Sequence, residues 1–455
     1  MSLIDKTLRE VIEQEILERG PIPFSRYMEM CLYHRELGYY SRNVEQFGMA
    51  GDFFTASDVH AVFGRLLARQ FEEMWRVLGS PPQIEILELG PGRGLFARDV
   101  LDWSQKKFPT FFAALHYSLR ERSPWLRRRL QETLREHIER GKASLAPPAD
   151  PPPVCHSERS RSRTAPEQKE TGEHITSGAE ASPTSGAKTS LTPQHSSQRS
   201  KRGATQDRSS FAVTCGVPEE SVIPRALATE VPTIVIANEF FDALPCEMAS
   251  ANGELRIAIE SGRLAETWAH PSTELLEFLD RHSVHPEPGE RIEVPLAAQA
   301  CMKQIASAIE RGFVVAIDYG YTRAEQLAGR HRGTLMTYRQ HSAASDPYQS
   351  PGEQDITAHV NFSALAAAVE QGGMTAQPLV TQSQFLLGIG EQTQFADAFE
   401  ECRLPQEKAK VALQLKHLIT PAGVGETFHV MVASNGVEAI QASQLSGLSF
   451  GKARR

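Results

Sequence analysis

The sequence predicts an α/β fold with a mostly parallel, doubly wound sheet, and three observations lead to that prediction. Two short apolar runs, residues 233–237 and 313–317, have the composition of strands that are buried on both faces. Strand-like segments alternate along the chain with segments of helical periodicity. A glycine-rich loop at residues 88–94 follows one such strand and precedes such a helix, where parallel α/β proteins place ligands.

Each element of this fold is expected from local patterns. The helices expected from the spacing of apolar residues span residues 3–17, 24–33, 60–78, 95–103 and 124–140. The expected strands span residues 83–89, 116–119, 233–237 and 313–317. Gly20 and Pro21 end the first helix.

The expected elements and the composition divide the chain into four segments. An N-terminal helical segment with a glycine-rich lid loop spans 1–80, and the first half of the core spans 81–144. A low-complexity insertion follows at 145–212, and the second half of the core spans 231–455, including a substrate subdomain at about 246–295. The insertion is predicted to be disordered, because it contains too few apolar residues to offset the entropy cost of ordering.

Charge and cysteine content narrow the class of protein. The net charge of −8 and the pI of about 6.0 give no reason to expect nucleic acid or an anionic membrane as a partner. The apolar run at 313–317 is too short to span a bilayer. The six cysteines form no C-x-x-C pair, which is typical of reduced thiols in the cytosol. No histidine motif indicates a metal site, and nothing in the sequence indicates an oligomeric state.

The composition of the N-terminus bears on the location of the protein in the cell. The first twenty residues carry several acidic side chains, which a secretory signal and a mitochondrial transit peptide both avoid. We therefore expect a cytoplasmic protein.

The glycine-rich loop predicts a cofactor site. Gly90, Gly92 and Gly94 have the spacing G-x-G-x-G, and Glu88 stands two residues before the first glycine. A nicotinamide fingerprint would instead read G-x-G-x-x-G. The variant resembles motif I of Rossmann-like methyltransferases, whose cofactor is S-adenosyl-L-methionine (SAM). Glu121, at the end of the next expected strand, is placed to accept the ribose hydroxyls of an adenosyl group.

A wider resemblance rests on seven blocks of sequence. They are GPIPFSRYMEMCLYHRELGYYSR (20–42), FGMAGDFFTASDVHAVFG (47–64), ILELGPGRG (86–94), ANEFFDALP (237–245), AIDYGY (316–321), RGTLMTY (332–338) and PGEQDITAHVNF (351–362). In these the chain resembles the MidA family, whose eukaryotic members include a mitochondrial complex I assembly factor that methylates arginine. The resemblance implies a Rossmann-like methyltransferase fold and a SAM-dependent enzyme that acts on arginine in a partner protein. The insertion falls between the blocks.

Two further blocks supply candidate site residues. Glu239 and Asp242 follow an expected buried strand, and carboxylates there can hold a guanidinium and localise its charge. Asn238, Gly51 and Asp52 are assigned to cofactor binding, the last two as part of a lid over the cofactor.

Three more side chains have a suggested place in the cleft. His359 is a candidate for taking a proton or orienting a carboxylate. Phe240 and Phe241 are expected either to wall the cavity or to lie in the core. The acceptor is expected to enter between residues 238–242 and residues 355–360.

Two alternatives to arginine methylation remain open on the sequence. The first is methyl transfer to another protein residue or to a small molecule. The second is a SAM-binding assembly chaperone with little catalysis, because a protein that only binds can keep the whole cofactor loop.

Overall fold

The computed structural model describes residues 6–42, 61–147, 231–339, 342–344 and 346–450. All of these belong to one compact unit, formed by Met1–Pro153 and Val217–Arg455. The expected lid loop with Gly51 and Asp52 lies outside the described residues, as does the expected insertion from residue 148 onward.

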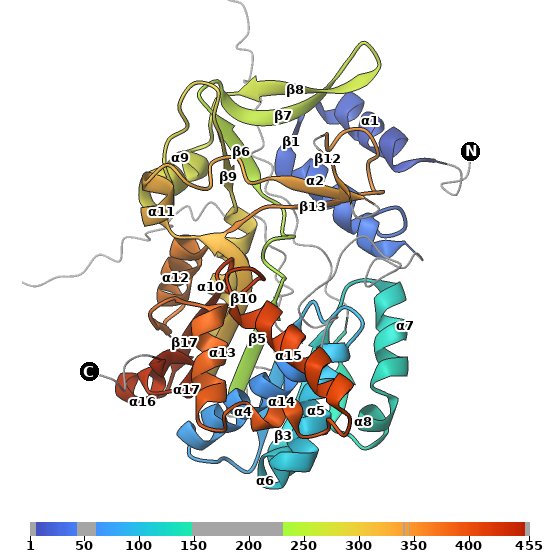
Figure 1. Cartoon of the computed structure of the whole chain (residues 1–455). Helices are drawn as coiled ribbons and strands as arrows, with labels where there is room; N and C mark the ends of the chain where they lie inside the picture. Colours follow the sequence, from blue (N-terminus) through green and yellow to red (C-terminus); the bar gives the residue numbers. More distant parts are fainter. Residues whose placement is uncertain (1–5, 43–60, 148–230, 340–341, 345, 451–455) are drawn as a thin grey trace, which may run out of the picture. The chain divides into compact units, whose positions relative to one another are not determined.

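A central, mostly parallel sheet forms the core of the unit (Figure 1). Its main strands are β2 (Ile84–Leu89), β3 (Leu115–Arg120), β4 (Ala143–Leu145), β5 (Thr233–Asn238), β10 (Gly312–Tyr321) and β17 (Phe428–Asn435). The parallel strands lie in the order β4-β3-β2-β5-β10, and β17 is antiparallel to β10. Short strands β14 (Val360–Asn361), β15 (Thr375–Ala376) and β16 (Val380–Thr381) extend it. The predicted doubly wound α/β fold is confirmed.

Helices cover both faces of this sheet, because successive residues of its strands point to opposite sides. Ile234 and Ile236 of β5 pack with α4 (Ala61–Val77), α5 (Leu95–Lys107) and α13 (Gln382–Glu391). Val235 and Ala237 pack instead with α10 (Leu296–Ala308) and α12 (Phe362–Gln371). This two-sided burial explains why β5 is a continuous apolar run rather than an alternating one.

Further helices belong to the same unit. They are α6 (Pro109–Ala114), α7 (Pro124–Thr133), α8 (Arg135–Glu139), α9 (Thr273–His282), α11 (Arg323–Leu327), α14 (Ala396–Phe399), α15 (Pro405–Ile419), α16 (Ala439–Ser443) and α17 (Ser446–Ser449). No helix in the described ranges is long and apolar enough to cross a membrane.

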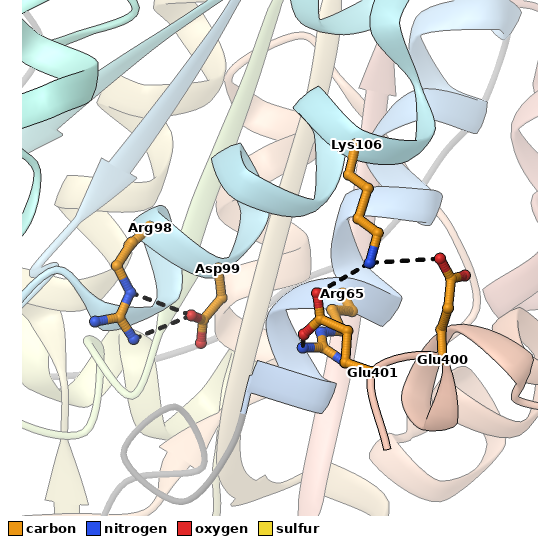
Figure 2. A network of polar contacts seen from close by, with 6 residues as sticks. All are labelled: Arg65, Arg98, Asp99, Lys106, Glu400 and Glu401. Atoms are coloured by element: carbon orange, nitrogen blue, oxygen red, sulfur yellow. Dashed lines mark hydrogen bonds and ion pairs between the residues drawn. The ribbon is translucent and has the colours of Figure 1, made fainter. Parts of the chain in front are cut away.

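Ion pairs fasten the segment after α14 to α4 and α5 (Figure 2). Glu401 pairs with Arg65, and its other carboxylate oxygen lies 3.0 Å from Lys106 Nζ. Glu400 lies 3.4 Å from the same ammonium. The Arg65 guanidinium also lies 4.7 Å from the centre of the Trp103 ring. Since several of these side chains are partly exposed, each ion pair contributes at most about 1 kcal/mol.

The N-terminal segment and the expected substrate subdomain share a smaller antiparallel sheet. Its strands are β1 (Ile22–Pro23), β6 (Glu247–Ser250), β7 (Gly253–Glu260), β8 (Arg263–Ala269) and β9 (Arg291–Val294). Ile22 pairs with Ile257 of β7, so the N-terminal segment is not purely helical. Helices α1 (Leu8–Arg19) and α2 (Phe24–Tyr33) and the turn η2 (Tyr39–Ser41) pack on this sheet through a shared apolar cluster.

A third sheet joins this region to the central sheet. It consists of β11 (Met336–Arg339), β12 (Ser342–Ala344) and β13 (Asp355–Thr357). Ile356 of β13 belongs to the apolar cluster of the N-terminal helices. The next residues lead into β14, which is parallel to the end of β10. Asp355 and His359 therefore stand where the two larger sheets meet.

Helix boundaries differ from expectation by more than one residue in three places. The helix expected over 95–103 continues to Lys107 as α5. The first helix begins at Leu8 rather than residue 3, because Thr7 and Glu10 form a capping box. The helix expected over 124–140 is divided into α7 and α8, because Leu134 adopts a non-helical backbone with φ −107° and ψ 14°.

Candidate active site

A cavity of about 970 Å³ opens at the carboxyl ends of β2, β3 and β5. The crossover from β4 to β5 reverses the strand order here, and such a switch point is where open α/β sheets bind ligands. The lining combines the loop after β2, the end of β3 and the loop after β5 with residues of α2, η2 and β13. The glycine loop (residues 88–94) and the acidic block (residues 238–242) thus line the same cavity.

The glycine loop has the backbone shape that its composition predicts. Gly90 and Gly92 have φ values of +63° and +54°, and both line the cavity. A Cβ on Gly90 would lie 3.0 Å from the ring of Phe240, so the loop and the acidic block are in close contact. Gly94 differs, since it lies outside the lining and a Cβ there would lie 2.5 Å from Leu130 of α7. Gly94 therefore allows α5 and α7 to pack closely.

Two buried carboxyl groups flank the loop. Glu88 accepts a hydrogen bond of 2.9 Å from the Tyr117 hydroxyl, and burial raises its pKa to about 8. Glu121 accepts the Ser123 N–H at 2.9 Å. Burial raises the pKa of Glu121 to about 7, against the opposing effect of backbone N–H groups that include that of Gly92. Glu121 therefore links the end of β3 to the glycine loop.

The loop after β5 carries the acidic candidates on a strained backbone. Glu239 has φ +50°, a left-handed conformation that costs a non-glycine residue roughly 1–2 kcal/mol. Asn238 donates to Glu239 Oε1 at 3.2 Å. The buried Asn238 Oδ1 has no hydrogen-bond partner among the described residues. Strain of this kind is common where a side chain is held for function.

The two carboxylate oxygens of Asp242 differ in their contacts. The Tyr319 hydroxyl donates to Asp242 Oδ2 at 2.6 Å. Asp242 Oδ1 is buried and has no hydrogen-bond partner within the described part of the chain. Burial raises the pKa of Asp242 to about 6, against the opposing effect of the Tyr319 hydroxyl and of the backbone N–H groups of Ala243 and Asp242. An ionised oxygen lacking a partner is suited to a cationic ligand.

The two phenylalanines of residues 238–242 differ in position, one in the cavity wall and one in the core. Phe240 lines the cavity, whereas Phe241 is 3% exposed and lies in the core beneath the sheet. Asp318 at the end of β10 is fully buried and lies behind the loop, outside the lining.

His359 lines the same cavity. Its Nδ1 lies 3.2 Å from His331 Nδ1, and its ring meets that of Tyr319 edge-on at 5.2 Å. Burial lowers the pKa of His359 to about 4, with His331 adding to the effect. The imidazole is therefore neutral at physiological pH, and its ring nitrogens are suited to hydrogen bonding rather than to holding a proton.

The structure adds lining residues that the sequence had not singled out. Tyr33 donates to the carbonyl oxygen of Ala243 at 3.0 Å, and the Arg122 guanidinium lies 4.6 Å from the Tyr33 ring centre. Tyr40 donates to Asp355 Oδ1 at 2.9 Å. The available signal was the aromatic and acidic content of the blocks at 20–42 and 351–362, but contacts between them depend on tertiary structure.

Comparisons with known proteins bear on this geometry. The model of a family described as "putative S-adenosyl-L-methionine-dependent methyltransferase" matches residues 66–380. The chain is 26% identical over 457 residues to the Drosophila melanogaster "Protein arginine methyltransferase NDUFAF7 homolog, mitochondrial", covering 98% of this chain and 88% of that protein. It is 25% identical over 464 residues to the Danio rerio "Protein arginine methyltransferase NDUFAF7, mitochondrial", with coverages of 98% and 90%.

Two solved structures from Burkholderia thailandensis are similar over nearly their whole length. One is bound to S-adenosyl-homocysteine and matches with a TM-score of 0.67 and 25% identity, covering 96% of this chain and 94% of that chain. The other is a native structure with a TM-score of 0.66 and 24% identity, covering 97% and 94%. The second similarity supports the fold alone.

The predicted cytoplasmic localisation is wrong. The relatives from Drosophila melanogaster, Danio rerio, Mus musculus and Homo sapiens are all named as mitochondrial proteins, which points to mitochondria. The prediction relied on acidic residues such as Glu13 and Glu18, which lie on α1. Since α1 is a folded helix that packs on the small sheet, its charges belong to a structural surface and carry no information about targeting.

Proposed function

The chain belongs to a family of S-adenosyl-L-methionine-dependent methyltransferases, and we propose that it methylates an arginine side chain of a partner protein. The predicted use of SAM is confirmed by the family and by the similar structure bound to S-adenosyl-homocysteine. The proposal of arginine is supported by the names of the relatives and by the acidic half of the cavity. The observation that carries it is the buried Asp242 Oδ1, which has no hydrogen-bond partner among the described residues and belongs to the same cavity lining as Glu239.

The residues around the glycine loop fit SAM. Gly90 and Gly92 have the left-handed backbone that favours glycine and both line the cavity, and the Glu121 carboxylate suits the ribose hydroxyls. Asn238 Oδ1 offers a buried acceptor without a partner among the described residues. When bound, the cofactor supplies an electrophilic methyl group on a sulfonium sulfur. Gly94, by contrast, supports the helix behind the loop.

The acidic residues then bind the acceptor. A guanidinium is a weak nucleophile because its charge is delocalised, so the Glu239 and Asp242 carboxylates hold it by charge-assisted bonds and draw the charge toward themselves. One proton leaves the guanidinium for each methyl group gained. Asp242 Oδ1 is the proposed acceptor of that proton, since burial has raised its pKa to about 6.

His359 and Tyr319 are assigned supporting roles on the same side of the cavity. The Tyr319 hydroxyl orients Asp242, and the His359 ring packs against the Tyr319 ring. Because His359 is neutral, it does not repel a guanidinium, and its contact with His331 fixes the orientation of its ring.

The test is to identify the methylated product. The purified full chain is incubated with methyl-labelled SAM and mitochondrial protein extract, and labelled proteins are hydrolysed in acid and analysed by mass spectrometry. Label is expected in methylarginine. Peptides that span the labelled site are then compared with copies in which lysine replaces that arginine, and these should take no label.

Two outcomes would replace the proposal. Label in another residue or in a small molecule would keep the transferase activity and change the acceptor. Binding of S-adenosyl-homocysteine without any transfer would favour an assembly chaperone.

A further inference from the structure

A single buried carboxylate holds the loop that carries the proposed acceptor-binding acids. Asp318 Oδ2 lies 3.2 Å, 3.1 Å and 3.3 Å from the backbone nitrogens of Phe240, Phe241 and Asp242, which all donate to it. Its other oxygen accepts the N–H of Tyr319 at 3.0 Å. Asp318 is 0% exposed, so these backbone groups replace the water that its carboxyl group loses on burial. Burial and the nearby Asp242 and Glu239 raise the pKa of Asp318, and the backbone hydrogen bonds oppose that shift.

These hydrogen bonds explain the strained backbone of Glu239, the residue directly before the three donors. The left-handed conformation of Glu239 turns the chain so that three successive N–H groups converge on one point. Successive amides in such a turn form a concave anion-binding site. Here a carboxyl group of the protein itself occupies that site, through the four backbone N–H groups that it accepts.

The end of β10 also fixes the side chain of Asp242. Tyr319 follows Asp318 directly and donates its hydroxyl to Asp242 Oδ2 at 2.6 Å. Asp318 therefore accepts the backbone N–H of Asp242, and Tyr319 donates to the carboxylate of Asp242. Asp318 itself does not line the cavity.

We infer that Asp318 is a positioning residue that sets the placement of Glu239 and Asp242 toward the methyl acceptor. The inference rests on the proposed role of these two acids in binding the acceptor. It assigns Asp318 no contact with cofactor or substrate, because its oxygens are occupied by the loop and by Tyr319. Its effect is therefore expected on transfer rather than on cofactor binding.

The test compares Asp318→Asn with a matched control. The control is Glu73→Gln, since the Glu73 carboxylate accepts the backbone N–H of Ser446 at 3.0 Å far from the cavity lining. For Asp318→Asn, hydrogen exchange of the amides at 240–242 should accelerate about tenfold or more. Turnover should fall by about 10–100-fold, because small misplacements of binding groups are costly. Affinity for S-adenosyl-homocysteine should change by less than about threefold, and the control should match wild type.

Several results would overturn the inference. A folded Asp318→Asn with wild-type exchange and turnover is one, and an equal loss of cofactor affinity and turnover is another, since it would indicate a general structural role. If Asp318→Asn does not fold, Asp318→Ser keeps a neutral acceptor and is measured in the same way. Unprotected amides at 240–242 in the wild-type protein would contradict the inference without any variant.

The outcome is separable from that of the proposed function. If the wild-type enzyme methylates an acceptor other than arginine, Asp318→Asn should still slow that transfer. If arginine is the acceptor and the variant turns over normally, the proposed function stands and the role of Asp318 does not.

Discussion

The two halves of the cavity are built in different ways. The proposed cofactor half uses mainly the backbone of one strand-to-helix turn and the Glu121 carboxylate directly after the adjacent strand, within residues 88–121, together with Asn238 at the end of β5. The acceptor half brings the loop after β5 together with Tyr33, Tyr40 and Asp355 from distant parts of the chain. A site made of backbone is determined locally, whereas a site made of converging side chains depends on how separate elements pack.

The largest effect is expected from the acceptor half. Glu239→Gln and Asp242→Asn should each lower methyl transfer by about 10²–10³-fold, because each removes a charge that stabilises the reacting guanidinium. Affinity for S-adenosyl-homocysteine, measured by titration calorimetry, should stay near the wild-type value. The two halves of the cavity would then be separable.

A control distinguishes this effect from loss of a buried charge in general. Glu247 is also a buried carboxyl group, with a pKa that burial raises to about 7, but it contacts Ser25 and is absent from the cavity lining. Glu247→Gln should keep wild-type turnover. Equal losses in all three variants would contradict a specific role for Glu239 and Asp242.

The next effect is expected in the cofactor half. Gly90→Ala places a Cβ against the Phe240 ring at a positive φ, so binding of S-adenosyl-homocysteine should weaken by about tenfold or more. Gly141 also has a positive φ, of +68°, but nothing lies within 4 Å of its Cβ position. Gly141→Ala should lose a similar roughly 1–2 kcal/mol of stability and bind the ligand normally. If Gly90→Ala binds S-adenosyl-homocysteine as wild type does, the glycine loop is not part of the cofactor site.

The smallest effect concerns stability and pH. Burial raises the pKa of Glu88 from its ordinary value of 4.5 to about 8, so the folded state binds a proton more tightly than the unfolded state. The stability from this group is therefore full below about pH 4.5 and is lost as the pH rises toward about 8, with a slope of at most about 1.4 kcal/mol per pH unit.

Denaturant unfolding of the ligand-free protein across this range measures the slope. Glu88→Gln should remove part of it and should be more stable than wild type near pH 8, since no charge has to be buried. Glu136, whose side chain is 82% exposed, provides a control, and Glu136→Gln should keep the wild-type slope. Identical slopes for wild type and Glu88→Gln would show that Glu88 is better solvated than its burial indicates.

Much of the core could be predicted from the sequence because its signals are local. The run at 313–317 is apolar on both faces, and the glycines after β2 require a turn. Strand β1 gave no such signal, since two residues are too few for a periodic pattern. Its pairing with β7 was therefore missed, and with it the strand that the N-terminal segment contributes.

The finer assignments in the site were less predictable. The spacing of Gly90, Gly92 and Gly94 suggests one shared role, yet Gly94 packs against Leu130, a contact that only the position of α7 determines. The task of Asp318 depends on the backbone direction of residues 240–242, which composition does not encode. Convergence of Tyr40 with Asp355 requires three sheets to be assembled first.

The strand order has a consequence for the timing of synthesis. β2 and β5 are neighbours in the sheet, but Leu89 and Thr233 are about 140 residues apart in the chain. At roughly 5–20 residues per second, the ribosome needs on the order of ten seconds or more between them. One edge of β2 has no native partner during that interval, and an unpaired apolar edge is prone to association with other chains. The strand that leads into the glycine loop is thus exposed to association with other chains until β5 has been made.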